Sequence, residues 1–160
     1  KKLLITGHTG FKGSWLSLCL QNFGAELIGV SLDPPTSPSL YEKANVSDGI
    51  KSLRQDIRNL EEVKKIFQIH KPEIVFHLAA QALVRYSYLN PVETYEVNVM
   101  GTLNILEGIR SIDTVRSAVI VTSDKCYKNI EKGGGYAENE PMGGHDPYSS
   151  SKGSAELLIS

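Results

Sequence analysis

The sequence is poor in the features that mark several protein classes. It holds two cysteines and one tryptophan in 160 residues, too few cysteines for a disulfide-stapled secreted domain. Its 17 lysines and arginines are matched by 18 acidic residues, and the net charge of -1 gives no bulk attraction to nucleic acid or to an anionic membrane. No apolar run approaches the roughly 20 residues that span a bilayer, and the chain opens into a strand-like run without a signal segment. We therefore expect a soluble, cytoplasmic protein with no nucleic-acid or membrane partner.

The two thiols, Cys19 and Cys126, lie far apart, and neither belongs to a CxxC or Cys/His cluster. Isolated cysteines of this kind are more often packing residues than part of a disulfide or a metal site. We expect both to be inert and expect no metal.

What the sequence does contain is an alternation of short apolar runs with amphipathic stretches. Runs with the length of buried strands lie at 2–6, 26–31, 52–57, 73–80 and 117–122. Helical spacing of apolar residues follows in 14–23, 60–68 and 92–112, and a last helix begins near Tyr148. The proline- and glycine-rich stretches 34–49 and 128–147 predict loops. Strands that alternate with helices predict repeated βαβ units, hence a doubly wound α/β domain of the Rossmann type with a parallel sheet.

Within two of these helices the spacing also indicates which side chains gather on one side. In 14–23 they are Trp15, Leu16, Cys19, Leu20 and Phe23, and in 60–68 the inward-facing set is Leu60, Val63, Ile66 and Phe67.

A glycine-rich segment, TGHTGFKG, places Gly7, Gly10 and Gly13 between the first strand and the first helix. Glycines suit a tight turn and a close approach of backbone to a pyrophosphate, and the amides of a helix N-terminus favour negative charge. The trio is alternatively a plain strand-to-helix turn, but its place in a βαβ unit favours a dinucleotide. The residues that we expect to line the phosphate site are Gly7, His8, Thr9, Gly10, Phe11, Lys12 and Gly13.

Asp33 follows Gly13 by 20 residues and stands at the end of the second strand. A carboxylate there accepts both ribose hydroxyls of the adenosine half and repels a 2′-phosphate, which favours NAD over NADP. The alternative is that Asp33 only begins the turn before Pro34 and Pro35.

Further residues on the cofactor side close the third and fourth strands, since ligands of open parallel sheets bind beyond the carboxyl ends of the strands. Ala79 and Ala80 are small enough to let a nucleotide lie against the backbone. Alternatively, their small side chains only allow a helix to pack closely on the strand. His77, inside the fourth apolar run, is expected to be a satisfied buried histidine. The residues placed on the cofactor side are Asp56, Ile57, Ala79, Ala80 and Gln81.

A candidate catalytic set follows the fifth strand. Tyr148 and Lys152 form the motif YSSSK, and positions i and i+4 share one helix face, so the Lys152 ammonium can approach the Tyr148 phenol and lower its pKa from about 10. Such a phenolate is a plausible base, and Ser123, at the end of a strand, can hydrogen-bond the same reacting oxygen. YxxxK alone is a common accident, but here it lies downstream of a glycine loop.

Together, TGxxGFxG, Asp33, Asp56, HLAAQ, NVMGTLNILE and YxxxK resemble the extended short-chain dehydrogenase/reductase superfamily, over essentially the whole chain. SLDPPT, TSDKCY and PMGGHDPYSSSK are more narrowly similar to nucleotide-sugar 4,6-dehydratases that act on CDP-glucose in deoxysugar (O-antigen) biosynthesis. The resemblance implies an internal redox cycle. Tyr148, helped by Lys152 and Ser123, removes the C4 hydroxyl proton while hydride passes to NAD, water then leaves across C5 and C6, and hydride returns at C6.

The resemblance also implies roles for other residues. Related dehydratases carry an Asp-Glu pair after the fifth strand, whereas this chain has Asp124 and Lys125. Asp124 is expected to protonate the leaving oxygen if burial raises its pKa. Lys125 is the C5 base, an electrostatic stabiliser of the enolate, or an ordinary surface lysine. Arg85 and Ser87, expected in a loop, are candidates to contact the sugar or its pyrophosphate. The helical residues that count as cofactor contacts are Asn98, Tyr148 and Lys152.

Two other functions stay open from the sequence. One is a nucleotide-sugar epimerase or reductase of the same fold, and the other is a non-catalytic NAD sensor, which we would expect to lack Tyr148 or Lys152. The long helix and the YxxxK helix resemble those that pair in homodimers through a four-helix bundle. Residues 1–160 are expected to be the NAD-binding domain of a longer enzyme, without its C-terminal substrate-binding region.

Overall fold

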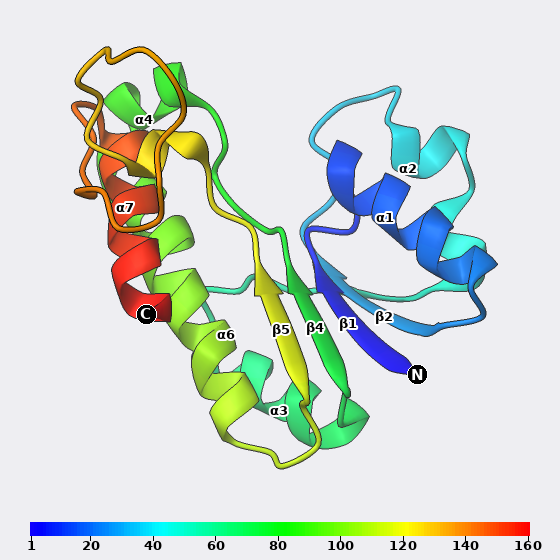
Figure 1. The fold of residues 1–160 in the computed structure, drawn as a ribbon. Helices are drawn as coiled ribbons and strands as arrows, with labels where there is room; N and C mark the ends of the chain where they lie inside the picture. Colours follow the sequence, from blue (N-terminus) through cyan, green and yellow to red (C-terminus); the bar gives the residue numbers. More distant parts are fainter. The chain divides into compact units, whose positions relative to one another are not determined.

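The apolar runs of the sequence form five strands, every neighbouring pair of which is parallel. The sheet has the order β3-β2-β1-β4-β5 (Figure 1). The chain runs outward from β1 to β2 and β3 and then returns to β4 on the other side of β1, so the strand order reverses between β1 and β4. The doubly wound α/β fold is thereby confirmed. The strands are β1 (Lys2–Thr6), β2 (Glu26–Ser31), β3 (Lys51–Arg54), β4 (Ile74–His77) and β5 (Ser117–Ile120).

The computed structural model describes all of residues 1–160, which cluster into two units. Unit 1 is Lys1–Ala79 with Asn104–Val121, and unit 2 is Ala80–Leu103 with Thr122–Ser160. Unit 1 holds the sheet with α1 (Phe11–Asn22), α2 (Leu40–Lys43), the 3₁₀ turn η1 (Val46–Gly49), α3 (Leu60–His70) and most of α6 (Gly101–Arg110). Unit 2 holds α4 (Val84–Leu89), α5 (Pro91–Tyr95), the π-helical turn η2 (Glu96–Met100), the 3₁₀ turn η3 (Asp124–Cys126) and α7 (Pro147–Ile159).

Within unit 1, helices cover both faces of the sheet (Figure 1). Right-handed crossovers place α1 and α2 on one face and α3 and α6 on the other. On the second face α3 and α6 touch closely, because a Cβ added to Gly108 would lie 2.5 Å from the ring of Phe67. The predicted inward face of α3 is buried at Val63, Ile66 and Phe67.

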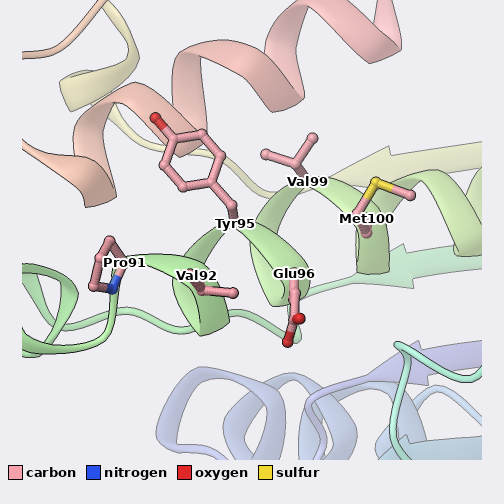
Figure 2. A pocket seen from close by; sticks show the side chains of 6 residues that line it. All are labelled: Pro91, Val92, Tyr95, Glu96, Val99 and Met100. Atoms are coloured by element: carbon pink, nitrogen blue, oxygen red, sulfur yellow. The ribbon is translucent and has the colours of Figure 1, made fainter.

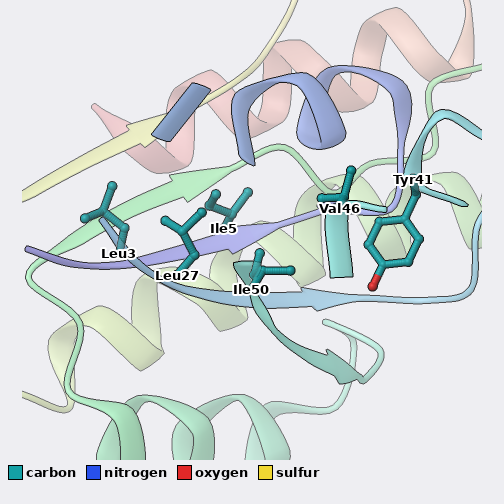
Figure 3. Close-up of a cluster of buried hydrophobic side chains, with 6 residues drawn as sticks. All are labelled: Leu3, Ile5, Leu27, Tyr41, Val46 and Ile50. Atoms are coloured by element: carbon teal, nitrogen blue, oxygen red, sulfur yellow. The ribbon is translucent and has the colours of Figure 1, made fainter. Parts of the chain in front are cut away.

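The core on the α2 side of the sheet is a cluster of six buried side chains from β1, β2 and the α2–η1 segment (Figure 3). Leu3 and Ile5 alternate along β1 and therefore point to the same face. Burying each aliphatic side chain of this kind contributes about 1.5–3 kcal/mol. The cluster comprises Leu3, Ile5, Leu27, Tyr41, Val46 and Ile50.

The buried face of α1 differs from the one that its apolar spacing indicates. Trp15 is 52% exposed and Phe23 is 85% exposed, and Cys19 is exposed as well, so its expected packing role is wrong. The helix buries Gly13, Ser14 and Ser17 instead, because only small side chains let it lie this close to the neighbouring backbone. Cys126 is buried, as a packing residue would be.

Several element boundaries also differ from the prediction. The segment 34–49 is not wholly a loop, since it contains α2 and η1. The third strand, predicted over 52–57, ends at Arg54, so Asp56 and Ile57 lie beyond it rather than at its end. Arg85 and Ser87 lie in α4, and the loop expected there is wrong. The helix predicted over 92–112 is present as α5, η2 and α6 in direct succession.

None of the helices has both the length and the apolar character that crossing a bilayer requires. No group of three or more histidine, cysteine or acidic side chains is placed to hold a metal ion.

Candidate functional site

The glycine loop between β1 and α1 has a backbone that only glycine allows at two positions. Gly7 has φ +75°, and a Cβ there would lie 2.8 Å from the backbone nitrogen of Ala79. A Cβ on Gly13 would lie 2.1 Å from the carbonyl oxygen of Gly7. Gly10 is the N-cap of α1, whose first turn carries no acidic residue, so the partial positive charge at the helix N-terminus is not neutralised. This arrangement suits a bound phosphate group.

The switch point between β1 and β4 is held together by Thr6. Its Oγ1 lies 2.6 Å from His77 Nδ1 and accepts the backbone N–H groups of Leu78 and Ala79, each at 3.1 Å. His77 is 2% exposed, which confirms it as a satisfied buried histidine. We did not predict the role of Thr6 from the sequence. The available signal was a hydroxyl residue at the end of an apolar strand and directly before the first glycine.

Within the loop, the predicted residues divide into buried and exposed side chains. The ring of His8 is fully buried, with Nε2 2.7 Å from Ser52 Oγ, and burial lowers its pKa to about 4, with the charge of Arg54 acting in the same direction. Thr9 Oγ1 lies 2.6 Å from Ser31 Oγ. Because these two side chains are committed to the interior, only their backbone remains available to a phosphate. Phe11 and Lys12 are exposed.

Asp33 follows β2 as predicted, and its side chain is 89% exposed. Arg54 Nε donates a hydrogen bond to Asp33 Oδ1 at 2.9 Å, a contact that the sequence did not indicate. Asp56 is bound by Arg58, whose backbone N–H donates to Oδ1 at 2.9 Å and whose guanidinium hydrogen bonds hold the pKa of Asp56 below its usual value, against the effect of burial. Ile57 is buried.

In unit 2, Asn98 joins three segments by its side chain. Its Oδ1 accepts the backbone N–H of Gln81 at 2.9 Å, and its Nδ2 donates to the carbonyl of Gln81 at 3.0 Å and to Ser151 Oγ at 2.9 Å. Gln81 also donates from Nε2 to Thr94 Oγ1 at 2.9 Å. The π-helical turn that carries Asn98 is a rare geometry that recurs at functional sites. Asn98 therefore fixes the segment that begins at Ala80 against the YxxxK helix.

The YxxxK pair lies on α7, near the start of the helix. Pro147 occupies the first turn, and Asp146 caps the helix by accepting the backbone N–H of Ser149 at 3.0 Å. Tyr148 is 9% exposed and Lys152 is 5% exposed. Burial lowers the pKa of Lys152 to about 8, while the nearby carboxylate of Glu156 acts to raise it. Tyr148 and Lys152 are thus both buried and lie one helical turn apart on α7.

Ser123, Asp124 and Lys125 form the turn that follows β5. Ser123 Oγ accepts the backbone N–H of Lys125 at 3.2 Å and donates to Asp124 Oδ1 at 3.0 Å. The Asp124 and Lys125 side chains are 84% and 52% exposed, with Lys125 Nζ 3.8 Å from Asp124 Oδ2. The burial on which the predicted acid role of Asp124 depends is therefore absent from the chain alone. The turn packs tightly on α7, because a Cβ on Gly153 would lie 3.1 Å from the carbonyl oxygen of Cys126.

A polar cavity of about 440 Å³ lies beside this turn. It is bordered by both charged residues of the turn and by the aromatic pair Tyr127 and Tyr136, whose rings stack with centroids 5.2 Å apart. His145 and Asp146 close it on the side of α7. A hollow with charged groups and an aromatic border has the chemistry to take a polar ligand.

The two predicted sugar contacts occupy different environments. Arg85 is exposed on α4. Ser87 is fully buried, and its Oγ accepts the backbone N–H of Tyr148 at 3.1 Å and donates to the carbonyl of Val84 at 2.7 Å. The contact of Ser87 is thus with the backbone of the candidate base, and the substrate contact of either residue stays a prediction.

A doubly wound sheet with a glycine loop at its switch point, together with a YxxxK helix, defines the extended short-chain dehydrogenase/reductase class. Within that class, residues 4–160 match the sequence model of the GDP-mannose 4,6 dehydratase family, and the chain belongs to that family.

Curated relatives and solved structures agree with this assignment. The chain is 54% identical to CDP-glucose 4,6-dehydratase of Salmonella typhimurium over all of its own residues and 45% of the relative. It is 32% identical to CDP-paratose 2-epimerase of Salmonella typhi, over 99% of this chain and 52% of the relative. The structure of UDP-glucose 4-epimerase from Thermotoga maritima with UDP-glucose matches with a TM-score of 0.86 at 30% identity, over 99% of this chain and 50% of that one.

A dehydratase structure also matches. That of dTDP-glucose 4,6-dehydratase from Bacillus anthracis in complex with NAD gives a TM-score of 0.79 at 25% identity, over 98% of this chain and 48% of that one. The chain thus spans about half the length of the relatives that it matches.

Proposed function

We propose that the protein containing this chain is an NAD-dependent nucleotide-sugar 4,6-dehydratase, which converts CDP-glucose to CDP-4-dehydro-6-deoxyglucose and water. The observation that carries the proposal is the packing of α7, with Tyr148 and Lys152, on the turn that holds Asp124 and Lys125. One unit thus contains a candidate base for oxidation and candidate groups for elimination. The 54% identical relative is named for this reaction.

The residues present fit NAD as the cofactor. The glycine cradle has no room for a Cβ at Gly7 or Gly13, and the N-terminus of α1 is free of acidic residues. The solved dTDP-glucose 4,6-dehydratase from Bacillus anthracis is a complex with NAD. NAD, when bound, supplies a hydride acceptor for C4 and a hydride donor for C6. The loop would hold the pyrophosphate, and Asp33 the adenosine ribose.

Tyr148 takes the proton from the C4 hydroxyl in this proposal. The Lys152 ammonium, buried on the same helix, stabilises the phenolate electrostatically. Ser123 turns its single O–H from Asp124 Oδ1 to donate a hydrogen bond to the reacting oxygen. Oxidation at C4 leaves a ketone that acidifies the proton at C5. After loss of water across C5 and C6, return of the hydride to C6 and of a proton to C5 would end each cycle without net oxidation of the sugar.

Asp124 and Lys125 serve the elimination. Asp124, whose exposed carboxylate the bound hexose would desolvate, protonates the C6 oxygen as it leaves, and Lys125 is either the base at C5 or the cation that stabilises the enolate. Both side chains border the polar cavity next to α7, and we propose that the hexose binds there. Exchange of the C5 proton with solvent deuterium separates the two roles of Lys125. The Lys125→Ala variant loses exchange if Lys125 is the base, and it exchanges at the wild-type rate if Lys125 is not.

The test of the function uses the full-length protein with CDP-glucose, dTDP-glucose, GDP-glucose and UDP-glucose. A product that absorbs in base as a 4-keto sugar, formed fastest from CDP-glucose, is the expected result. A change of sugar configuration without a 4-keto product would instead identify an epimerase. Tyr148→Phe should lower turnover by about 10²- to 10⁴-fold, the range of general acid–base catalysis.

We also propose that the protein forms a homodimer through its long helical segment. A hollow of about 430 Å³ lies along α5 and η2 (Figure 2). It has an apolar border at Val92, Tyr95 and Met100, which are 70%, 37% and 50% exposed. Exposed apolar side chains that gather on one helical face mark an interaction surface, and a second copy in a four-helix bundle would cover it.

Light scattering on the full-length protein tests the dimer. Met100→Glu should convert a dimer to a monomer, whereas Ile69→Glu, at a residue of α3 that is 72% exposed, should not. A Met100→Glu protein that stays dimeric would place the interface elsewhere. We further propose that the protein is cytoplasmic, where reducing conditions keep the exposed Cys19 as a free thiol. Its product would serve deoxysugar (O-antigen) biosynthesis.

A further inference from the structure

Arg54 stands beside the carboxylate that is proposed to bind the adenosine ribose. β2 and β3 pair so that Arg54 lies opposite Ser31. Ser31 precedes Asp33 by two residues. From there Arg54 Nε donates to Asp33 Oδ1 at 2.9 Å. A cation is therefore in direct contact with the group that reads the ribose hydroxyls.

The guanidinium is held by more than this ion pair. Its Nη1 donates to Ser52 Oγ at 2.9 Å, and its central carbon lies 5.2 Å from the ring centroid of Tyr41. Ser52 is in turn 2.7 Å from His8 Nε2 and accepts from the Tyr41 hydroxyl at 3.2 Å. An exposed ion pair alone contributes little, but a guanidinium fixed by a ring and a hydroxyl loses less freedom when it binds an anion.

The two charges have opposite effects on a ribose that carries a phosphate. The Asp33 carboxylate accepts the hydroxyls of an unmodified ribose and repels a 2′-phosphate. A guanidinium presents a planar fork of N–H donors that matches phosphate oxygens. Because Arg54 is bonded to Asp33, a 2′-phosphate that displaces the carboxylate meets a cation already in place.

We propose that Arg54 is a specificity-determining residue of the dinucleotide site, which orients Asp33 for the ribose of NAD and also gives a 2′-phosphate a cation to bind. The protein should therefore retain measurable affinity for NADP, below its affinity for NAD. This inference rests on the proposed function, since it assigns Asp33 to the adenosine ribose.

Calorimetric Kd values for NAD and NADP on the full-length protein test the inference. Arg54→Met keeps the packing on Tyr41 and removes the charge. We expect it to weaken NAD binding about threefold and NADP binding about thirtyfold. The Kd for NADP divided by the Kd for NAD should therefore rise about tenfold. Arg54→Lys, which keeps a charge without the fork, should show a smaller rise. Arg110→Met is the matched control, because Arg110 forms an exposed pair with Glu107 on α6 and should leave both Kd values unchanged.

The background of Asp33→Asn separates the two effects. There, Arg54→Met should no longer weaken NAD binding, since the carboxylate that Arg54 orients is gone, and it should still weaken NADP binding. If Arg54→Met leaves the ratio of the two Kd values unchanged, whether or not both dinucleotides bind more weakly, the inference is overturned while NAD remains the cofactor. Failure of the unaltered protein to bind either dinucleotide would overturn the proposed function, and this inference with it.

Discussion

Ser87 and Tyr148 are joined by a hydrogen bond, in which the backbone N–H of Tyr148 donates to Ser87 Oγ at 3.1 Å. The first backbone N–H groups of a helix have no partner within the helix. At the start of α7, the side chain of Asp146 accepts the N–H of Ser149, and its carbonyl oxygen accepts that of Ser150. Ser87 therefore satisfies a further N–H and fixes the position at which the candidate base leaves the backbone.

Replacement of Ser87 by alanine should weaken both the fold and catalysis. The Ser87→Ala protein is expected to lose about 1–2 kcal/mol of unfolding free energy, since a buried N–H is left without an acceptor. Its kcat should fall because Tyr148 is less well positioned. Urea unfolding and steady-state kinetics measure the two effects. Ser154→Ala, in which the lost bond is to the carbonyl of Ser150 on the same helix, is the control and should change kcat little.

The activity should decline above pH 8 as Lys152 loses its proton. Burial lowers the pKa of Lys152 to about 8, so the ammonium that we propose to stabilise the Tyr148 phenolate is present below this pH and lost above it. Glu156, which also accepts a hydrogen bond from Thr122 Oγ1, acts to raise this pKa. Glu156→Gln should therefore move the decline in kcat to lower pH.

The pH profile of kcat for the two proteins measures this shift. Glu138→Gln, at an exposed residue of the loop before α7, should leave the profile where it is. A Glu156→Gln profile that coincides with the wild-type one would show that Glu156 does not tune Lys152.

Acid should destabilise the fold through His8. The pKa of His8 is about 4 in the folded chain and about 6.5 in an unfolded one, so the unfolded chain binds the proton more readily. The stability that the neutral ring contributes is present above pH 6.5 and is lost as the pH falls toward 4, up to about 3 kcal/mol.

Unfolding free energies at pH 7 and pH 4.5 measure this loss. The difference should shrink in His8→Gln and should persist in His145→Gln, which changes an exposed histidine. An equal pH dependence in all three proteins would assign the acid sensitivity to other groups.

Alanine substitutions in the glycine loop should differ strongly in cost. A Cβ at position 13 meets the Gly7 carbonyl at 2.1 Å, whereas a Cβ at position 10 lies 3.3 Å from the same oxygen, and Gly10 has an ordinary φ of -76°. Gly13→Ala should cost about 3 kcal/mol of unfolding free energy and abolish NAD binding, and Gly10→Ala less than about 1 kcal/mol. Chemical unfolding of the two variants checks the contrast, and equal costs would show that the loop yields at position 13.

The strands that the sequence predicted best are those whose ends are marked by glycine or proline. The limits of β2 agree with the prediction at both ends, because Gly24 precedes it and Pro34 follows closely. α2 was missed since it has four residues, and its stability comes from the reciprocal bonds of Ser39 and Glu42 rather than from apolar spacing. Short capped helices within proline-rich segments leave little periodic signal.

The candidate site was predictable where a motif sets the spacing, and not where strand pairing does. The three loop glycines are close to one another in the sequence, and so, separately, are Tyr148 and Lys152. Local geometry therefore brings together the members of each set. The contact between Arg54 and Asp33 depends on the register of β2 with β3, which no local pattern shows. The buried side of α1 was likewise set by contact with the glycine loop rather than by its apolar residues.

The position of β5 affects how a polypeptide cut to residues 1–160 must be handled. Within these residues β5 pairs with β4 on one side, and Ser117, Ala118 and Val119 are exposed. An unpaired strand margin is a template for adding strands from other molecules. Concentrated solutions of the cut polypeptide should therefore be prone to aggregation, and a lysine at Val119 should improve its solubility.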